Sequence, residues 1–334
     1  MSAEKIIGDW KKANFKPIYW LEGEEPYFID KIVEYAEHKI LNESEASFNL
    51  TVFYGRDANW ADVINACRRY PMFAERQVVL LKEAQHMKEI ERLEGYVDNP
   101  LNSTVFVVSY KDKKVDARTK FAKVLKAKGE VFTTKKLYDN ELPNWANVMI
   151  SQHGLGISQK ALLLLVDHVG NDLSRLENEI EKLAVNLGAR KSINEDDIEN
   201  YIGISKEFNV FELQAAFGKK DFAKAIRIVN YFEKNPKAGP IQLILPSLYS
   251  FFSKVYAIFS AGTTDEKTIA STIGISPFFV KDYIAASRNY NYQGVEKILL
   301  LLHHYNLRSL GIYDAGSSDA GLMKEFTVKV MSNG

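Results

Sequence analysis

The sequence predicts an α/β domain followed by helical domains, and three observations support this fold class. Over residues 1–140, apolar runs of strand length alternate with amphipathic stretches of helical spacing. Such alternation is typical of a mostly parallel sheet with helices on both faces. Beyond residue 140 the strand-like runs disappear, and helical patterns punctuated by glycines replace them. The 334 residues also exceed one typical hydrophobic core, so two or three domains are expected.

Five runs rich in β-branched and aromatic residues predict the strands of the first domain. In chain order they are Pro17–Leu21, Phe48–Tyr54, Gln77–Leu81, Thr104–Tyr110 and Glu130–Thr133. Between the runs, apolar residues recur at helical spacing, as Phe28, Ile32 and Ala36 do.

Four helices are predicted after the sheet, with Ser158, Asp172 and Asn194 as N-caps of the last three. They span Asn144–His153, Ser158–Val169, Asp172–Leu187 and Asn194–Ile202. A second helical block begins near Asn209 and runs to the end, with a clear turn at Asp314–Ser318. We therefore divide the chain into domains at 1–140, 141–208 and 209–334.

Composition excludes several classes of protein. Lys and Arg together number 43, as do Asp and Glu, so bulk charge does not indicate nucleic-acid or membrane binding. Cys67 is the only cysteine, which excludes an internal disulfide and fits a reducing compartment. The N-terminus shows no signal peptide. The apolar stretch Ile241–Ala261 is interrupted by Pro246 and Lys254, which favours a buried helix over a membrane span. We expect a cytoplasmic protein without a membrane partner.

The turn after the first strand lies where a P-loop ATPase binds phosphate, but its residues do not suit a nucleotide. A phosphate loop needs GxxxxGK[ST], and of this pattern only Gly23 is present. Glu24 and Glu25 would repel a polyphosphate, and Pro26 has no amide hydrogen to offer. Lys82 follows the third strand, where a P-loop ATPase places an Asp that holds Mg²⁺. We therefore predict no cofactor and no ATPase activity.

No catalytic or metal-binding group replaces the missing nucleotide site. In related ATPases an Arg near the start of the helix after Gly170 reaches the γ-phosphate. Here Ser174 falls at about that place, and Arg175 lies one residue later, rotated about 100° around the helix. Leu173 and Leu176 indicate instead an N-capped helix that faces a core. The six histidines show no metal spacing, and no catalytic triad stands out.

The segment Pro71-Met72-Phe73 places two large apolar side chains at a probable helix end, just before the third strand. Because proline disfavours the helical conformation of the preceding residue, the chain should turn at Tyr70 and project Met72 and Phe73 outward. This arrangement suggests a protein that grips a partner. On composition alone, burial of both side chains in the domain's own core is slightly favoured.

Two regions are candidates for DNA contact. Lys111–Lys136 contains ten basic and three acidic residues, which usually means only a solvated surface. Contact with a phosphate backbone is the functional alternative, with Lys113, Lys114 and Arg118 as candidates. Tyr313 is a candidate for base stacking, although a packed tyrosine is the favoured interpretation.

A third candidate region is Thr268–Val280, which resembles a helix-turn-helix with Ser276 and Pro277 opening its second helix. The second helix has too many apolar residues for a convincing recognition helix, so packing is favoured.

Taken together, the sequence resembles the delta-subunit family of bacterial DNA polymerase III clamp loaders over its whole length. The segments that carry the resemblance are Pro17–Tyr27, Tyr70–Ala84, Leu137–Trp145, Gly170–Leu173, Asn178–Leu183 and Glu207–Leu213. Their order and spacing together are more specific than any one of them.

The resemblance implies a degenerate AAA+-like domain without ATPase activity, a lid-like helical domain and a helical collar for assembly. It implies four partners: the beta sliding clamp, the gamma/tau ATPase subunits, the delta-prime subunit and primed DNA. The clamp-contacting residues fall on Pro71, Met72 and Phe73. The first residue of the hydrophobic pair is often Leu in the family, and Met conserves its volume. The alternatives are a degenerate AAA+ adaptor in helicase loading, or a helix-turn-helix DNA-binding regulator.

Overall fold

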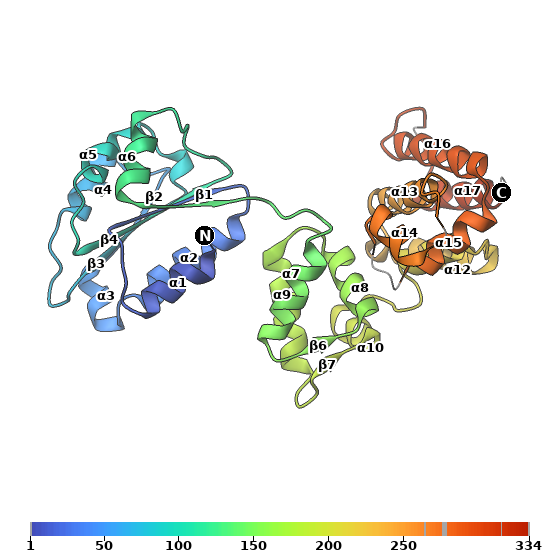
Figure 1. Cartoon of the computed structure of the whole chain (residues 1–334), viewed down its shortest axis with the longest axis horizontal. Coiled ribbons are helices and arrows are strands. Elements are labelled where there is room, and N and C mark those ends of the chain that lie inside the picture. The colour runs from blue at the N-terminus through green and yellow to red at the C-terminus, as the bar shows by residue number, and fades with distance from the viewer. Residues whose placement is uncertain (1, 264, 276–278, 315, 333–334) are drawn as a thin grey trace. The chain divides into compact units, whose positions relative to one another are not determined.

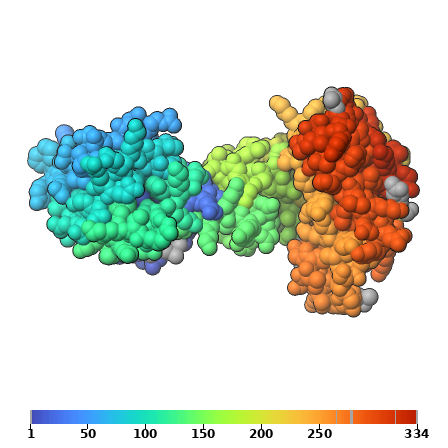
Figure 2. Space-filling model, turned by 90° about the horizontal axis from the view of Figure 1, so that it is seen from above, coloured from blue at the N-terminus to red at the C-terminus, as the bar shows by residue number. Residues whose placement is uncertain are grey.

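The computed structural model describes residues 2–263, 265–275, 279–314 and 316–332. Two compact units, Met1–Tyr138 and Asp139–Gly334, make up the chain. Figure 1 labels their helices and strands, and Figure 2 shows the atoms of both units, coloured from blue to red along the sequence. The further division of the second unit near residue 208 stays a prediction.

The first unit contains a five-stranded parallel sheet in the order β2-β3-β4-β1-β5. Its strands are β1 (Ile18–Gly23), β2 (Leu50–Tyr54), β3 (Gln77–Lys82), β4 (Thr104–Lys111) and β5 (Glu130–Thr134). All five predicted strands are present. The second begins two residues later than expected, because Phe48 and Asn49 end a helix.

Helices cover both faces of this sheet (Figure 1). They are α1 (Ala3–Lys11), α2 (Pro26–Lys39), α3 (Glu43–Asn49), α4 (Trp60–Cys67), α5 (Glu94–Val97) and α6 (Lys120–Lys128). Alternate residues of β1 enter opposite cores, as the pleat requires. Trp20 packs in the cluster that contains α4 and α6, whereas Leu21 packs in the cluster that contains α1 and α2. The α/β prediction for this part of the chain is therefore confirmed.

The second unit is mainly helical. Its helices are α7 (Leu142–Gln152), α8 (Gln159–Val169), α9 (Leu173–Asn186), α10 (Glu195–Asp197), α11 (Val210–Gly218), α12 (Phe222–Lys234), α13 (Ile241–Ile258), α14 (Glu266–Ile273), α15 (Val280–Asn289), α16 (Tyr292–Ser309) and α17 (Asp319–Ser332). The predicted caps Ser158, Asp172 and Asn194 each accept a backbone N–H hydrogen bond at a helix start.

The second unit also contains two short strands where the sequence shows no strand-like run. Gly156–Ile157 (β6) and Ser192–Ile193 (β7) form a small parallel pair. Strands of two residues are too short to produce an alternating hydrophobic pattern.

Helix α13 is long and apolar enough, by length and composition alone, to cross a membrane. Its residues Leu248, Phe252 and Val255 are fully buried in the largest hydrophobic cluster of the second unit. The burial of this face agrees with the prediction of a core helix.

Candidate functional site

The turn after β1 lies at the carboxyl edge of the parallel sheet, where proteins of this architecture bind their ligands. In this chain the backbone N–H groups of the turn already have partners. Gly23 N–H donates to the carbonyl of Lys113 (3.1 Å), and Glu24 N–H donates to the carbonyl of Thr134 (3.4 Å). Glu25 N–H donates to Oγ1 of Thr134 (3.1 Å). The groups that would cradle a phosphate are therefore engaged within the unit.

Close packing and a buried acidic side chain also make this turn unsuitable for a polyphosphate. A Cβ atom at Gly23 would lie 2.2 Å from the carbonyl oxygen of Thr134, so no side chain fits there. Glu22 is buried beside it, and its Oε2 accepts hydrogen bonds from Trp20 Nε1 (3.1 Å) and Val115 N–H (3.0 Å). A buried carboxylate at this position opposes the approach of a polyphosphate.

Lys82, at the position where a P-loop ATPase holds its metal, forms an ion pair inside the unit. Its Nζ lies 2.6 Å from Oε2 of Glu37 on α2. One strand away, Nζ of Lys111 lies 2.6 Å from Oδ1 of Asp30 on the same helix. These residues line a cavity of about 230 Å³. The two ion pairs tie α2 to the ends of β3 and β4, where a nucleotide site would require free charges.

The remaining candidate groups for catalysis do not form a catalytic site. Ser174 and Arg175 are exposed at the start of α9, while Leu173 and Leu176 are buried, as predicted. Cys67 is a free thiol whose pKa is raised by burial, which makes it a poor nucleophile. Over the part of the chain that the structure describes, no cluster of three His, Cys, Asp or Glu side chains has the arrangement of a metal site.

The apolar segment before β3 projects from the first unit. Helix α4 ends at Cys67, and beyond Pro71 the side chain of Met72 is 54% exposed and that of Phe73 is 96% exposed. The outward projection is therefore confirmed, and burial in the core, which composition alone favoured, is wrong. Phe73 has a φ of 55°, a left-handed conformation that a bulky residue rarely adopts.

Two buried amide side chains hold the backbone at this segment. The side chain of Asn49 accepts from Met72 N–H (2.7 Å) and donates to the carbonyl of Met72 (2.9 Å). The side chain of Gln77 donates to the carbonyl of Arg69 (2.6 Å) and to Oγ1 of Thr104 (2.8 Å). The backbone is thus held at Arg69, just before the segment, and at Met72 within it, by residues from β3 and α3.

Asn49 was not identified from the sequence, because Phe48–Tyr54 was predicted to be a strand throughout. A signal was present in Asn42 and Glu45, which form a capping box at the start of α3. Recognition of this motif would have predicted a helix that begins at Glu43, shortly before Asn49.

The three candidate DNA-contacting side chains differ in whether an acidic side chain already pairs with them. Lys113 and Lys114 are exposed, and neither forms an ion pair with a residue that the structure describes. Arg118 instead binds Asp116, with Nη2 2.6 Å from Oδ2 and Nε 3.0 Å from Oδ1. The hydrogen bonds from Arg118 hold the pKa of Asp116 below its usual value. Among these three candidates, the two lysines therefore have the charge that is available to a phosphate backbone.

Tyr313 lies in the second unit, in the turn after α16. Its side chain is 83% exposed, and its φ is 67°. The favoured interpretation, a packed tyrosine, is therefore wrong. The ring is free to stack, but the three candidate cations lie in the other unit.

In the region that resembles a helix-turn-helix, the apolar side chains pack against one another. Ile269, Ala270 and Ile273 of α14 form a buried cluster with Val280, the first residue of α15. This agrees with the expectation of a packing role. Ser276 and Pro277, expected to open the second helix, lie outside the described residues.

The last block of helices presents aromatic and aliphatic side chains to solvent. Tyr249 on α13 is 51% exposed, and Leu300 on α16 is 66% exposed. The ring of Tyr292 on α16 lies against those of Tyr256 and Phe259. These residues form a candidate assembly surface.

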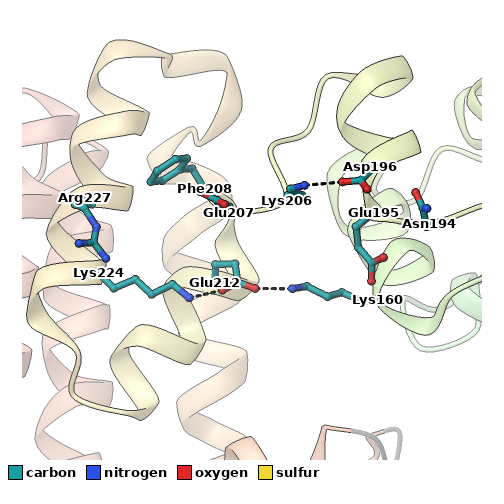
Figure 3. Close-up of a pocket in the computed structure, with 10 residues that line it drawn as sticks. All are labelled: Lys160, Asn194, Glu195, Asp196, Lys206, Glu207, Phe208, Glu212, Lys224 and Arg227. Atoms are coloured by element: carbon teal, nitrogen blue, oxygen red, sulfur yellow. Dashed lines mark hydrogen bonds and ion pairs between the residues drawn. The ribbon is translucent and has the colours of Figure 1, made fainter.

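A cavity of about 650 Å³ lies in the second unit (Figure 3). Oε1 of Glu212 on α11 lies 2.7 Å from Nζ of Lys160 on α8, and its other oxygen binds Lys224 on α12. Lys206 binds Asp196 at 2.6 Å. Ligand pockets are mostly apolar with a few polar groups, whereas this lining is charged and largely paired. We interpret the cavity as a solvated junction between helices.

Comparison with known proteins gives related matches along the chain. A model described as "DNA polymerase III, delta subunit" matches residues 19–135, and one described as "DNA polymerase III delta subunit, C-terminal domain" matches residues 207–308. DNA polymerase III subunit delta of Bacillus subtilis is 25% identical over 94% of this chain and 92% of its own length. A probable delta subunit of Aquifex aeolicus is 24% identical over 83% of each chain.

A solved structure also resembles the chain. The DNA clamp loader delta protein of Bacillus subtilis superimposes with a TM-score of 0.56 at 23% identity, and 99% of each chain is covered. The predicted fold class, a parallel sheet of the P-loop type with helical domains after it, is thereby confirmed. The two matched regions lie in order along the chain and both describe one protein family. This chain therefore belongs to the DNA polymerase III delta subunit family.

Proposed function

We propose that this chain is a non-catalytic clamp-loader subunit that binds and opens the DNA sliding clamp, so that the clamp can be loaded onto primed DNA. The observation that carries the proposal is the exposure of Met72 and Phe73, in a segment whose backbone is held by hydrogen bonds at Arg69 and Met72. Large apolar side chains held rigidly in solvent are typical anchors of protein interfaces. Pro71, Met72 and Phe73 would enter an apolar pocket on the beta sliding clamp.

The same proposal assigns ATP hydrolysis to other subunits. The amides of Gly23 and Glu24 are engaged, and Lys82 is paired with Glu37, so Mg²⁺-ATP has neither its phosphate cradle nor its metal ligand here. The gamma/tau ATPase subunits would supply the nucleotide-dependent step. This chain would be an accessory subunit of the DNA polymerase III holoenzyme.

Assembly with the gamma/tau and delta-prime subunits would use the last helical block, where Tyr249 and Leu300 are exposed. Such side chains are enriched at interface cores. A protein with these partners would act in the cytoplasm, on primed DNA held within the complex.

The decisive experiment measures binding of the purified full-length chain to the beta sliding clamp, with and without ATP. We expect a one-to-one complex whose affinity does not change with ATP. Absence of binding would refute the proposal. Binding of a replicative helicase instead would support the adaptor alternative, and sequence-specific DNA binding would support a regulator.

A further inference from the structure

We infer that Asn49 is a positioning residue for clamp binding, which holds Met72 and Phe73 in the binding conformation before the clamp arrives. This inference rests on the proposed function. Asn49 is 2% exposed, so its side chain cannot itself make an extensive contact with a partner. Any effect of Asn49 on clamp binding should therefore pass through the residues that it holds.

The side-chain amide of Asn49 is chemically matched to the backbone of Met72. Its Oδ1 accepts from Met72 N–H (2.7 Å), while its Nδ2 donates to the carbonyls of Met72 (2.9 Å) and Glu45 (2.9 Å). Donor and acceptor both face a complementary group, so rotation of the amide by 180° would lose all three contacts. Aspartate has the same shape but lacks the donor.

The conformation of the next residue explains why such a support is needed. Phe73 has a φ of 55°, and a bulky residue stays in the left-handed region only where its surroundings hold it there. The Phe73 side chain is 96% exposed, so its own packing contributes little to this restraint. The hydrogen bonds of Asn49 to Met72 restrain the backbone directly before it.

Such a restraint raises affinity without adding a contact. When a partner binds only one conformation, the apparent dissociation constant equals the intrinsic dissociation constant divided by the fraction of molecules in that conformation. If loss of the Asn49 contacts leaves about one molecule in ten in the binding conformation, the dissociation constant for the clamp rises about tenfold. The increase should come with faster hydrogen exchange at Met72 N–H, which is protected by Oδ1 of Asn49.

The test compares the full-length wild type with Asn49→Asp and Asn49→Ala in two measurements: affinity for the beta sliding clamp, and hydrogen exchange over residues 70–76. We expect about tenfold weaker binding and faster exchange at Met72, while β3 stays protected. Val63→Ala is the matched control, because Val63 is fully buried in the same unit and packs in the cluster that contains Trp20 and Phe121. It should lower stability without weakening clamp binding.

A double-mutant cycle with Phe73→Ala separates positioning from a general loss of structure. If Asn49 acts through this segment, Asn49→Asp should weaken binding much less in the Phe73→Ala background than in the wild type. Equal losses in both backgrounds, unchanged binding by a folded Asn49→Asp variant, or an equal loss in Val63→Ala would each overturn the inference. If the wild type does not bind the clamp, the proposed function fails, and the exchange measurement still shows whether Asn49 orders the segment.

Discussion

Asn49 and Met72 are 23 residues apart in the chain, and their contact consists of two hydrogen bonds between one side-chain amide and one backbone. Through them, the end of α3 fixes the segment that carries the exposed side chains of Met72 and Phe73. The contact makes a surface loop behave as part of the folded scaffold. Functional side chains on rigid supports lose less conformational entropy on binding.

Changing Met72 and Phe73 together to alanine should abolish most of the clamp affinity and leave the fold intact. Each anchor could contribute about 1.5–3 kcal/mol through apolar burial, so the dissociation constant should rise at least about a hundredfold. Because both side chains are exposed, the melting temperature should change little. Calorimetric titration with the clamp and thermal unfolding measure the two effects.

Tyr54 is another exposed aromatic residue of the first unit. Tyr54→Ala is the control for the double change, and this variant should keep its clamp affinity. A double variant that melts many degrees lower, or that still opens the clamp, would contradict the assignment.

Restoring an aspartate at the metal position should not restore nucleotide binding. Lys82→Asp would place a carboxylate beside Glu37, and the lost charged hydrogen bond should lower the free energy of unfolding by about 1–3 kcal/mol. ATP should remain unbound, because the amides of Gly23 and Glu24 are still engaged. Calorimetry with Mg²⁺-ATP and denaturant unfolding test both parts. Micromolar ATP affinity in either the wild type or the variant would refute the prediction.

Acid should weaken the junction around Glu212. Burial raises the pKa of Glu212, but hydrogen bonds from Lys160 and Lys224 outweigh this effect and hold the pKa below the usual value of a glutamate. A carboxyl group whose pKa is lowered by folding stabilises the folded state above its unfolded pKa, and this contribution disappears as pH falls through the folded pKa. Glu212→Gln should therefore cost about 1–3 kcal/mol at pH 7.

The difference between wild type and Glu212→Gln should shrink as pH falls below 4.5, which denaturant unfolding from pH 7 to pH 3 can follow. Glu195→Gln, in the same cavity, is the matched control. A difference that stays constant over this range would show that the Glu212 ion pairs do not stabilise the second unit.

DNA binding by the isolated chain should be weak, salt-sensitive and indifferent to sequence. Replacing Lys113 and Lys114 by alanine should lower the slope of log affinity against log salt by about one to two, since each lysine would release about one counterion. Arg118→Ala should have a smaller effect, because Asp116 already binds that side chain. Tyr313→Ala should weaken binding to single strands by about 1–3 kcal/mol if the ring stacks on a base.

Fluorescence anisotropy with labelled DNA at several salt concentrations measures these effects. Tight binding that persists at high salt, or a preference for one sequence, would overturn this view of the DNA contact.

The last helical block should be required for assembly with the ATPase subunits. A chain ending near Tyr201 lacks the exposed residues of α13 and α16, and we expect it to be absent from the loader complex in size-exclusion chromatography. In the full-length chain, Tyr249→Asp should weaken assembly without lowering the melting temperature, because this side chain is half exposed. Assembly of the shortened chain as efficiently as full length would contradict the prediction.

Local patterns in the sequence were sufficient to predict the helices and strands of this protein and the loss of its nucleotide motif. Strand-length apolar runs such as Gln77–Leu81, and caps such as Ser158 and Asp172, depend on neighbours a few positions away, so local patterns reveal them. The missing lysine and hydroxyl after Gly23 are likewise visible in the sequence. The family resemblance, carried by the order of several short segments, directed attention to Met72 and Phe73.

The exposure and the hydrogen-bond partners of the site residues depend on tertiary contacts. Whether Met72 and Phe73 face the core or the solvent depends on where α3 and β3 lie, and composition favoured the wrong answer. The amides of Gly23 and Glu24 are engaged by residues about 90 to 110 positions later. Asn49 gains its role from Met72 in the same way. Contacts between residues far apart in sequence leave no local pattern, because the fold alone brings such residues together.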